Sequence, residues 1–266
     1  MPTTTFIDDV SDPRLELYRN IRERDLVGRQ GLFVAEGTVV LEKLADSLLH
    51  RAQSLLIAGD RVAALEPLLS RFPADVPCYV APPAVLDAVA GFPMHRGVLA
   101  IGRPAEERGV EALLDQASGG DVLLLCGIAN HDNMGGIFRN AAAFGVRGVL
   151  LDADCCDPLY RKAIRVSVGA VLTVPFARLR RGEDPLELLD RHGVVPVALS
   201  PSGEVPLHEW QPIGRTAVLL GAEGPGLAPA LMARTSTVRI TMASGFDSLN
   251  VATTSGIVLH HLASRR

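Results

Sequence analysis

Short, uninterrupted apolar runs recur through the second half of the chain, and they constrain its fold more than any other feature. DVLLLCGIAN, VRGVLLD and TAVLLGA each contain such a run, and each run ends at a Gly or an Asp. Continuous Val/Leu/Ile runs suit parallel strands that helices cover on both faces. Helical patterns such as GGIFRNAAAFG lie between the runs. The alternation predicts an α/β fold with a parallel sheet over residues 118–266.

The first half shows the same alternation on a smaller scale. The expected strands are GLFVAEG, AQSLLIAG, VPCYV and RGVLAIGRP, and the expected helices are TVVLEKLADSLL, RVAALEPLLSRF and PPAVLDAVAGF. An amphipathic, arginine-bearing helix is expected ahead of these elements, with Asp12 as its N-cap and Pro13 at its first position. We expect an α/β domain over residues 12–104. The stretch GRPAEERGVEALLDQASGG combines Pro, Gly and charge, so a linker is expected over residues 105–117.

Charge and cysteine usage narrow the class of protein. The net charge of −4 argues against a nucleic-acid binder, but almost all basic residues are arginine, which suits bidentate phosphate contacts. The four cysteines have no C-x-x-C spacing, so neither a zinc site nor a disulfide framework is expected, and buried packing roles are favoured over nucleophilic ones. No apolar run approaches the ~20 residues that cross a bilayer. We expect a cytoplasmic protein that binds no membrane and no metal.

Three segments carry more polar and glycine residues than folding needs. The first, 130–140, follows a strand and opens a helix, where ligands bind in α/β sheets. Asn130 is as well explained by a capping role, whereas Arg139 falls one turn into a helix of apolar or small residues. The second segment, 219–227, contains three glycines that allow close backbone approach to a ligand, with Glu223 expected to orient a neighbour such as Arg139.

The third segment, 240–251, precedes a final helix expected over Ser248 to Leu262. Asp247 or Ser248 can cap that helix, which leaves Asn250 inside its first turn and able to point into a shared pocket. No dinucleotide-binding fingerprint and no phosphate-loop motif is present. A nicotinamide-dependent oxidoreductase is therefore disfavoured.

Together these motifs resemble the SpoU/TrmH family of S-adenosylmethionine-dependent RNA ribose 2'-O-methyltransferases, in the SPOUT superfamily. The resemblance rests on Asn-x-Gly-x-x-x-Arg, Gly-x-Glu-Gly and Ile-x-Met followed by Ser-Leu-Asn-Val, in this order. It implies a SPOUT parallel sheet with a deep trefoil knot, a homodimer, and an N-terminal domain similar to the ribosomal-protein-like RNA-binding domain of relatives. Thr241 stands where relatives usually carry proline.

The resemblance also implies roles for particular residues. Arg139 matches the catalytic arginine, and the other polar site positions are Asn133, Glu223, Ser248 and Asn250. The adenosine of the cofactor is expected against the segments that contain Leu220, Gly221, Gly224, Ile240, Met242 and Leu249. The arginines expected to form an RNA-binding groove are Arg14, Arg22, Arg24, Arg29, Arg161 and Arg165, although each alone is as well read as part of a solvated helix face.

The expected reaction removes a proton from a ribose hydroxyl as its oxygen attacks the methyl carbon of a sulfonium. A guanidinium with a pKa above about 12 is a poor base. We therefore expect Arg139 to hold the target phosphate or to stabilise the alkoxide. The alternative is a non-catalytic RNA-binding or ribosome-assembly factor that retains the fold, and the substrate RNA is either ribosomal or transfer RNA.

Overall fold

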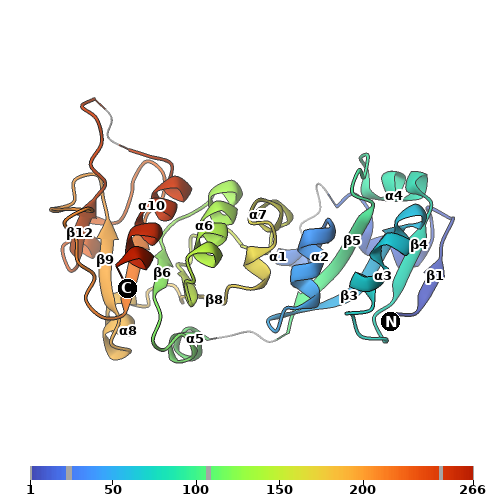
Figure 1. Cartoon of the computed structure of the whole chain (residues 1–266), viewed down its shortest axis with the longest axis horizontal. Coiled ribbons are helices and arrows are strands. Elements are labelled where there is room, and N and C mark those ends of the chain that lie inside the picture. The colour runs from blue at the N-terminus through green and yellow to red at the C-terminus, as the bar shows by residue number, and fades with distance from the viewer. Residues whose placement is uncertain (1, 22–25, 106–108, 246–247, 266) are drawn as a thin grey trace. The chain divides into compact units, whose positions relative to one another are not determined.

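The computed structural model describes residues 2–21, 26–105, 109–245 and 248–265. They form two compact units, one of residues 1–107 with 159–173, the other of residues 108–158 with 174–266 (Figure 1). The segment 159–173 lies inside the second domain predicted from the sequence, but it packs with the first unit.

The sheet of the first unit has five strands in the order β1-β4-β3-β5-β2. Pairing is parallel between β1, β4 and β3 and antiparallel where β5 joins β3 and β2. The strands are β1 (Thr4–Phe6), β2 (Phe33–Glu36), β3 (His50–Ala58), β4 (Cys78–Ala81) and β5 (Val98–Pro104). The α-helices are α1 (Val27–Gln30), α2 (Thr38–Ala45), α3 (Val62–Leu69) and α4 (Pro83–Ala90). The predicted alternation in this half is confirmed, and the edge strand β1 was not predicted.

The expected amphipathic helix at the start of the chain is a short 3-10 helix, Pro13–Tyr18. Its cap is the predicted one, because the Asp12 side chain accepts a hydrogen bond from the backbone N–H of Arg14. The Tyr18 hydroxyl is buried and lies 2.7 Å from the Ser54 Oγ of β3. The rest of the predicted helix includes residues 22–25, which lie outside the described residues.

The segment 159–173 contains α7 (Arg161–Val166) and a 3-10 helix, Ala170–Leu172. It is joined to the rest of the first unit by hydrogen bonds and an ion pair: the Ser47 hydroxyl donates to the Leu172 carbonyl at 2.6 Å, and Arg161 Nη2 lies 2.5 Å from Glu36 Oε2. The apolar run AVLTVPF, residues 170–176, predicts a strand in the sequence, but this prediction is wrong for all but its last residue, because strand structure begins only at Phe176.

The second unit has a seven-stranded sheet in the order β10-β12-β9-β11-β6-β7-β8, with every pair parallel. The strands are β6 (Val122–Leu125), β7 (Gly148–Leu151), β8 (Phe176–Arg178), β9 (Val195–Leu199), β10 (Val205–Pro206), β11 (Thr216–Leu220) and β12 (Ser236–Arg239). The helices are α5 (Val110–Gln116), α6 (His131–Ala143), α8 (Pro185–Arg191), α9 (Pro229–Met232) and α10 (Val251–Ser264). The predicted parallel sheet is confirmed.

Helices cover both faces of this sheet. α5 and α8 pack on one face in a cluster that includes Leu113, Leu189 and Ala177 of β8. Phe176 precedes Ala177 and so points to the opposite face. There its ring meets the Phe138 ring of α6 edge-on at 5.7 Å. α5 occupies much of the predicted linker, 105–117, and that part of the range belongs to the core of the second unit.

Candidate functional site

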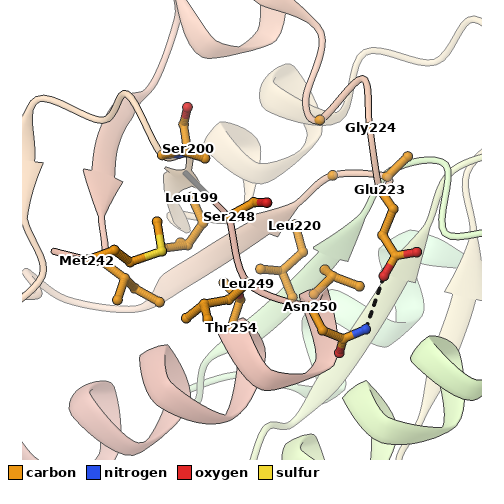
Figure 2. A pocket seen from close by; sticks show the side chains of 16 residues that line it. Leu199, Ser200, Leu220, Glu223, Gly224, Met242, Ser248, Leu249, Asn250 and Thr254 are labelled. Carbon is orange, nitrogen blue, oxygen red and sulfur yellow. Dashed lines mark hydrogen bonds between the residues drawn. The ribbon is translucent and has the colours of Figure 1, made fainter. Parts of the chain in front are cut away.

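A pocket of about 500 Å³ opens at the carboxyl ends of three neighbouring strands, β9, β11 and β12, beside the start of α10 (Figure 2). Its lining is largely apolar, and Leu249 is 41% exposed within it. All six residues expected to contact a cofactor line this one pocket, namely Leu220, Gly221, Gly224, Ile240, Met242 and Leu249. The structure therefore brings two sequence motifs, about 20 residues apart, to a common cavity.

The loop after β11 is folded tightly on itself. A Cβ at Gly221 would lie 2.4 Å from the carbonyl carbon of Gly226, and the Gly226 N–H donates to the Ala222 carbonyl at 3.0 Å. Gly224 and Gly226 have φ values of +86° and +68°, which side chains disfavour. The glycines predicted to admit a ligand are thus already required by the loop's own geometry.

Asn250 connects the three predicted motifs. Its Nδ2 donates to Asn133 Oδ1 at 2.8 Å and to Glu223 Oε1 at 3.0 Å (Figure 2 shows the second bond). Its Oδ1 accepts from the backbone N–H groups of Ala252 and Thr253, so Asn250 is the N-cap of α10. The expectation that Asn250 lies inside the first turn is wrong, because this helix begins three residues later than predicted.

The amino end of α6 carries Asn133, which accepts the hydrogen bond from Asn250. Asn130 is the N-cap of α6, accepting from the N–H groups of Asp132 and Asn133, so its capping role is confirmed. The Asn133 side chain is only 6% exposed and turns toward α10. The two helices approach closely, since a Cβ at Gly136 would lie 2.7 Å from the Ala252 Cβ.

Arg139 and Ser248 occupy different surroundings. Ser248 lines the pocket and is exposed. Arg139 is exposed on α6, does not line the pocket, and makes no hydrogen bond or ion pair with the part of the chain that the structure describes. Glu223 does hold a neighbouring side chain, as expected, but that neighbour is Asn250 and, among the described contacts, not Arg139.

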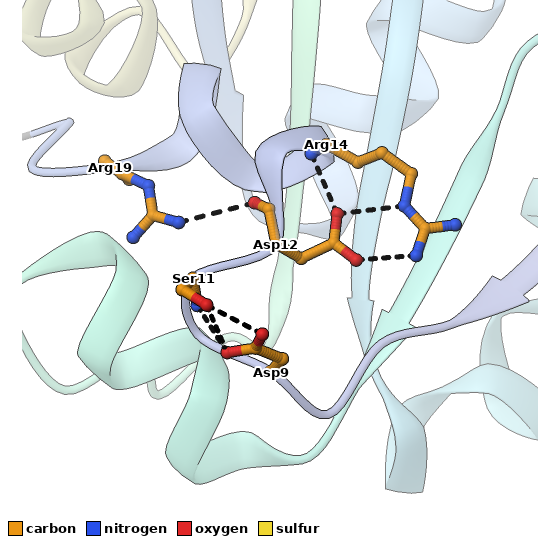
Figure 3. Close-up of polar contacts among 5 residues, drawn as sticks. All are labelled: Asp9, Ser11, Asp12, Arg14 and Arg19. Carbon is orange, nitrogen blue, oxygen red and sulfur yellow. Dashed lines mark hydrogen bonds and ion pairs between the residues drawn. The ribbon is translucent and has the colours of Figure 1, made fainter.

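The predicted RNA-binding arginines fall into distinct groups. Arg14 donates through Nε and Nη2 to both carboxylate oxygens of Asp12 (Figure 3), and these hydrogen bonds lower the pKa of Asp12 to about 2. Arg161 is 16% exposed, pairs with Glu36 and lies over the Phe92 ring. Arg161 is therefore engaged within the first unit, and its part in an RNA-binding groove stays a prediction.

Of the remaining predicted arginines, the structure describes the side chain of Arg165. Arg165 is exposed on α7, and no described residue pairs with it. Arg29 lies in α1. Arg22 and Arg24 lie outside the described residues.

Sequence reasoning missed the part of the pocket formed at the end of β9. Leu199, Ser200 and Pro201 line it there, and Thr254 lines it from α10. The turn-forming run Pro201-Ser202-Gly203 directly after an apolar strand was the available signal. This run indicates part of a site only when the strand order is known, because β9 then lies beside β11 in the sheet.

Other chemistries find little support in the described residues. Burial raises the thiol pKa of Cys126 and Cys155 to about 12 and that of Cys78 and Cys156 to about 11, so none is an activated nucleophile. No cluster of three His, Cys, Asp or Glu side chains is arranged to hold a metal ion within the described ranges. None of the described helices has the length and apolarity to span a bilayer.

Comparison with known proteins finds similarity to RNA methyltransferases in sequence and in fold. Residues 121–260 match the SpoU rRNA Methylase family. An uncharacterized tRNA/rRNA methyltransferase of Mycobacterium tuberculosis is 38% identical over 95% of this chain and 89% of its own length. The 23S rRNA (guanosine-2'-O-)-methyltransferase RlmB of Vibrio vulnificus is 30% identical over 68% of this chain and 75% of its own. The AdoMet-bound rRNA methyltransferase from Sinorhizobium meliloti shares the fold, with a TM-score of 0.81, 23% identity and 98% of both chains covered.

Proposed function

Because this chain belongs to the SpoU rRNA methylase family, we propose that it transfers a methyl group from S-adenosylmethionine to a ribose 2'-hydroxyl of an RNA. The observation that carries the proposal is the joining of the three motifs: Asn250 ties Asn133 and Glu223 together at the rim of the pocket that the cofactor residues line. Ribosomal RNA is the preferred substrate class, because it is the substrate named for the related enzyme of Vibrio vulnificus.

The pocket suits this cofactor on its own chemistry. Its volume of about 500 Å³ and apolar walls are typical of small-molecule sites. The aliphatic side chains of Leu220, Ile240 and Leu249 suit a flat adenine base. Glu223 is the one ionisable side chain among the described lining residues, and its carboxylate complements a positive charge. When bound there, S-adenosylmethionine supplies an electrophilic methyl group on a cationic sulfur.

The chain's own residues then have separable tasks. Asn250 fixes the start of α10 and holds Asn133 and Glu223 in place, so it preorganises the rim. Arg139, exposed and unpaired among the described residues, is free to hold the phosphate beside the target ribose or to stabilise the developing alkoxide. Its guanidinium is not the base. Loss of the hydroxyl proton is aided by a neighbouring phosphate or by Ser248.

Further features follow from family membership. We propose that the second unit contains the deep trefoil knot, that the protein acts as a homodimer in the cytoplasm, and that residues 12–104 contribute to RNA binding. Ile257 of α10 supports dimerisation, because it is 37% exposed beside a second hollow that Leu207 and His260 also line. Light scattering after size-exclusion chromatography tests the dimer, with twice the 28.3 kDa chain mass expected.

The experiment that tests the role of Arg139 is single-turnover methyl transfer by Arg139→Lys. The chemical rate is expected to fall even at saturating RNA, because a lysine cannot reproduce the planar fork of donors. Arg181→Lys, at an exposed arginine paired with Asp154, is the control. A full rate with weakened RNA affinity would refute the role in the transition state.

The non-catalytic alternative makes a different prediction. A ribosome-assembly factor that only retained the fold would bind RNA without needing the cofactor pocket. Titration calorimetry with S-adenosylmethionine therefore separates the two functions. Binding that is lost in Gly221→Ala supports the enzyme, and no binding by the wild-type protein would favour the assembly factor.

A further inference from the structure

Two arginines stand directly opposite each other in the sheet of the first unit. Arg51 of β3 and Arg103 of β5 are register partners in an antiparallel pair. Directly opposed residues of adjacent strands project from the same face, with Cβ atoms about 4.5–5.5 Å apart. Both side chains are exposed. The fold thus places two guanidinium groups side by side at one end of the sheet.

No described residue supplies either arginine with a counter-charge. Within the described ranges, neither side chain makes an ion pair or a hydrogen bond, whereas Arg14, Arg71 and Arg191 each pair with a carboxylate. Like charges at directly opposed strand positions destabilise a sheet. The chain as a whole is acidic, with a net charge of −4. A pair of cations to which no described residue offers an acidic partner, in an acidic chain, is a feature that folding alone does not explain.

The backbone beneath the pair is held firmly. Arg51 follows His50, which is 4% exposed, and the His50 Nδ1 lies 3.2 Å from the Leu172 carbonyl oxygen. Arg103 follows Gly102, where a Cβ would lie 2.3 Å from the Phe33 ring. That ring in turn meets the His50 imidazole edge-on at 5.3 Å. The two arginines therefore project from a packed, preorganised base, which reduces the entropy lost on binding.

We propose that Arg51 and Arg103 together form a phosphate clamp that binds the sugar-phosphate backbone of the substrate RNA. This inference rests on the proposed function, which makes RNA the polyanion that the protein must bind. Guanidinium groups present planar, bidentate donors to phosphate oxygens, and a bound phosphate would relieve the repulsion between the two cations. Backbone contacts of this kind position an RNA without reading its sequence. The clamp would thus position the RNA on the first unit, while target selection lies elsewhere.

The test compares RNA affinity as a function of salt for the full-length wild-type protein and the double variant Arg51→Gln/Arg103→Gln. The probe is a fluorescein-labelled hairpin RNA, titrated between about 50 and 200 mM salt. Each lost phosphate contact lowers the slope of log K against log salt by about 0.7–0.9. The matched control is Arg71→Gln/Arg191→Gln, which removes the same charge from arginines that already pair with Asp46 and Glu111.

The slope of the Arg51→Gln/Arg103→Gln variant is expected to fall by about 0.7 to 1.8, for one or two contacts, while the control slope stays at the wild-type value. Arg51→Lys/Arg103→Lys should retain most of the slope because it keeps both charges. The thermal midpoint of the glutamine variant should equal or exceed that of the wild type, because a repulsion is removed. A lower midpoint would instead assign the pair to folding and overturn the clamp.

Three further outcomes distinguish a failure of the clamp from a failure of the proposed function. A double variant that transfers methyl groups and keeps the wild-type salt slope would overturn the clamp and leave the proposed function intact. A wild-type protein that neither bound the RNA nor transferred a methyl group would overturn both. Binding of inorganic phosphate to the wild-type protein that is lost in the glutamine variant, while the salt slope of RNA binding stays unchanged in that variant, would identify a free anion as the occupant and refute the RNA assignment.

Discussion

Asn250 is the residue whose replacement tests the site most sharply, because one amide performs two separable tasks. Asn250→Ala removes the N-cap of α10, worth about 1 kcal/mol. It also leaves the Asn133 Oδ1 without its donor, and because Asn133 is 6% exposed this costs about 1–3 kcal/mol. Glu223 is exposed, so water replaces its lost bond at little cost. The expected total is about 2–4 kcal/mol.

Asn250→Ser separates the two contributions. Serine caps a helix about as well as asparagine but cannot reach Asn133, so only the second loss, about 1–3 kcal/mol, is expected. The assay is urea unfolding followed by the fluorescence of Trp210, the single tryptophan, which is 8% exposed in the second unit together with Asn250. Equal losses for the alanine and serine variants would refute the capping role. No loss in either would refute the bridging account altogether.

Three other perturbations have defined outcomes. Gly221→Ala should abolish S-adenosylmethionine binding in calorimetry, since its Cβ would meet backbone at 2.4 Å, while Gly109→Ala, in open space, should bind normally. Cys126 and Cys155 should react slowly with a thiol reagent at pH 8 in the folded protein, because burial raises their pKa to about 12, and fast labelling would contradict this. The free energy of unfolding should also fall above pH ~9, because there the thiols ionise in the unfolded chain and stay protonated in the folded one. Glu36→Gln should lower the thermal midpoint, because it leaves Arg161, its buried partner, unpaired, and an unchanged midpoint would show that the ion pair is not needed.

The parallel sheet was predictable because apolar runs are local signals in the sequence. The six residues expected at the cofactor were predictable only through the resemblance of their motifs to a known family. It did not contain the strand order. β9 lies between β11 and β12 in space, and this order brings Ser200 and Pro201 into the pocket. Strand order depends on how separate helices pack, and no spacing within the sequence reports it.

Long-range partners account for the other differences. A helix near Arg161 was predictable, but its counter-charge, Glu36, lies 125 residues earlier in the chain. The same holds for Asn250, whose capping role competes in sequence with that of Ser248 and is decided by the contact with Asn133. Sequence patterns identified the residue types at the site, whereas tertiary packing determined which of them are paired.

The most direct test of the account is the chemical identity of the methylated product. RNA from a strain lacking the protein is incubated with the purified enzyme and labelled S-adenosylmethionine, digested to nucleosides and separated by mass. The account predicts a 2'-O-methylnucleoside that forms with the wild-type protein and fails to form with Arg139→Ala. A label on a base, or no label in any RNA of that strain, would contradict it.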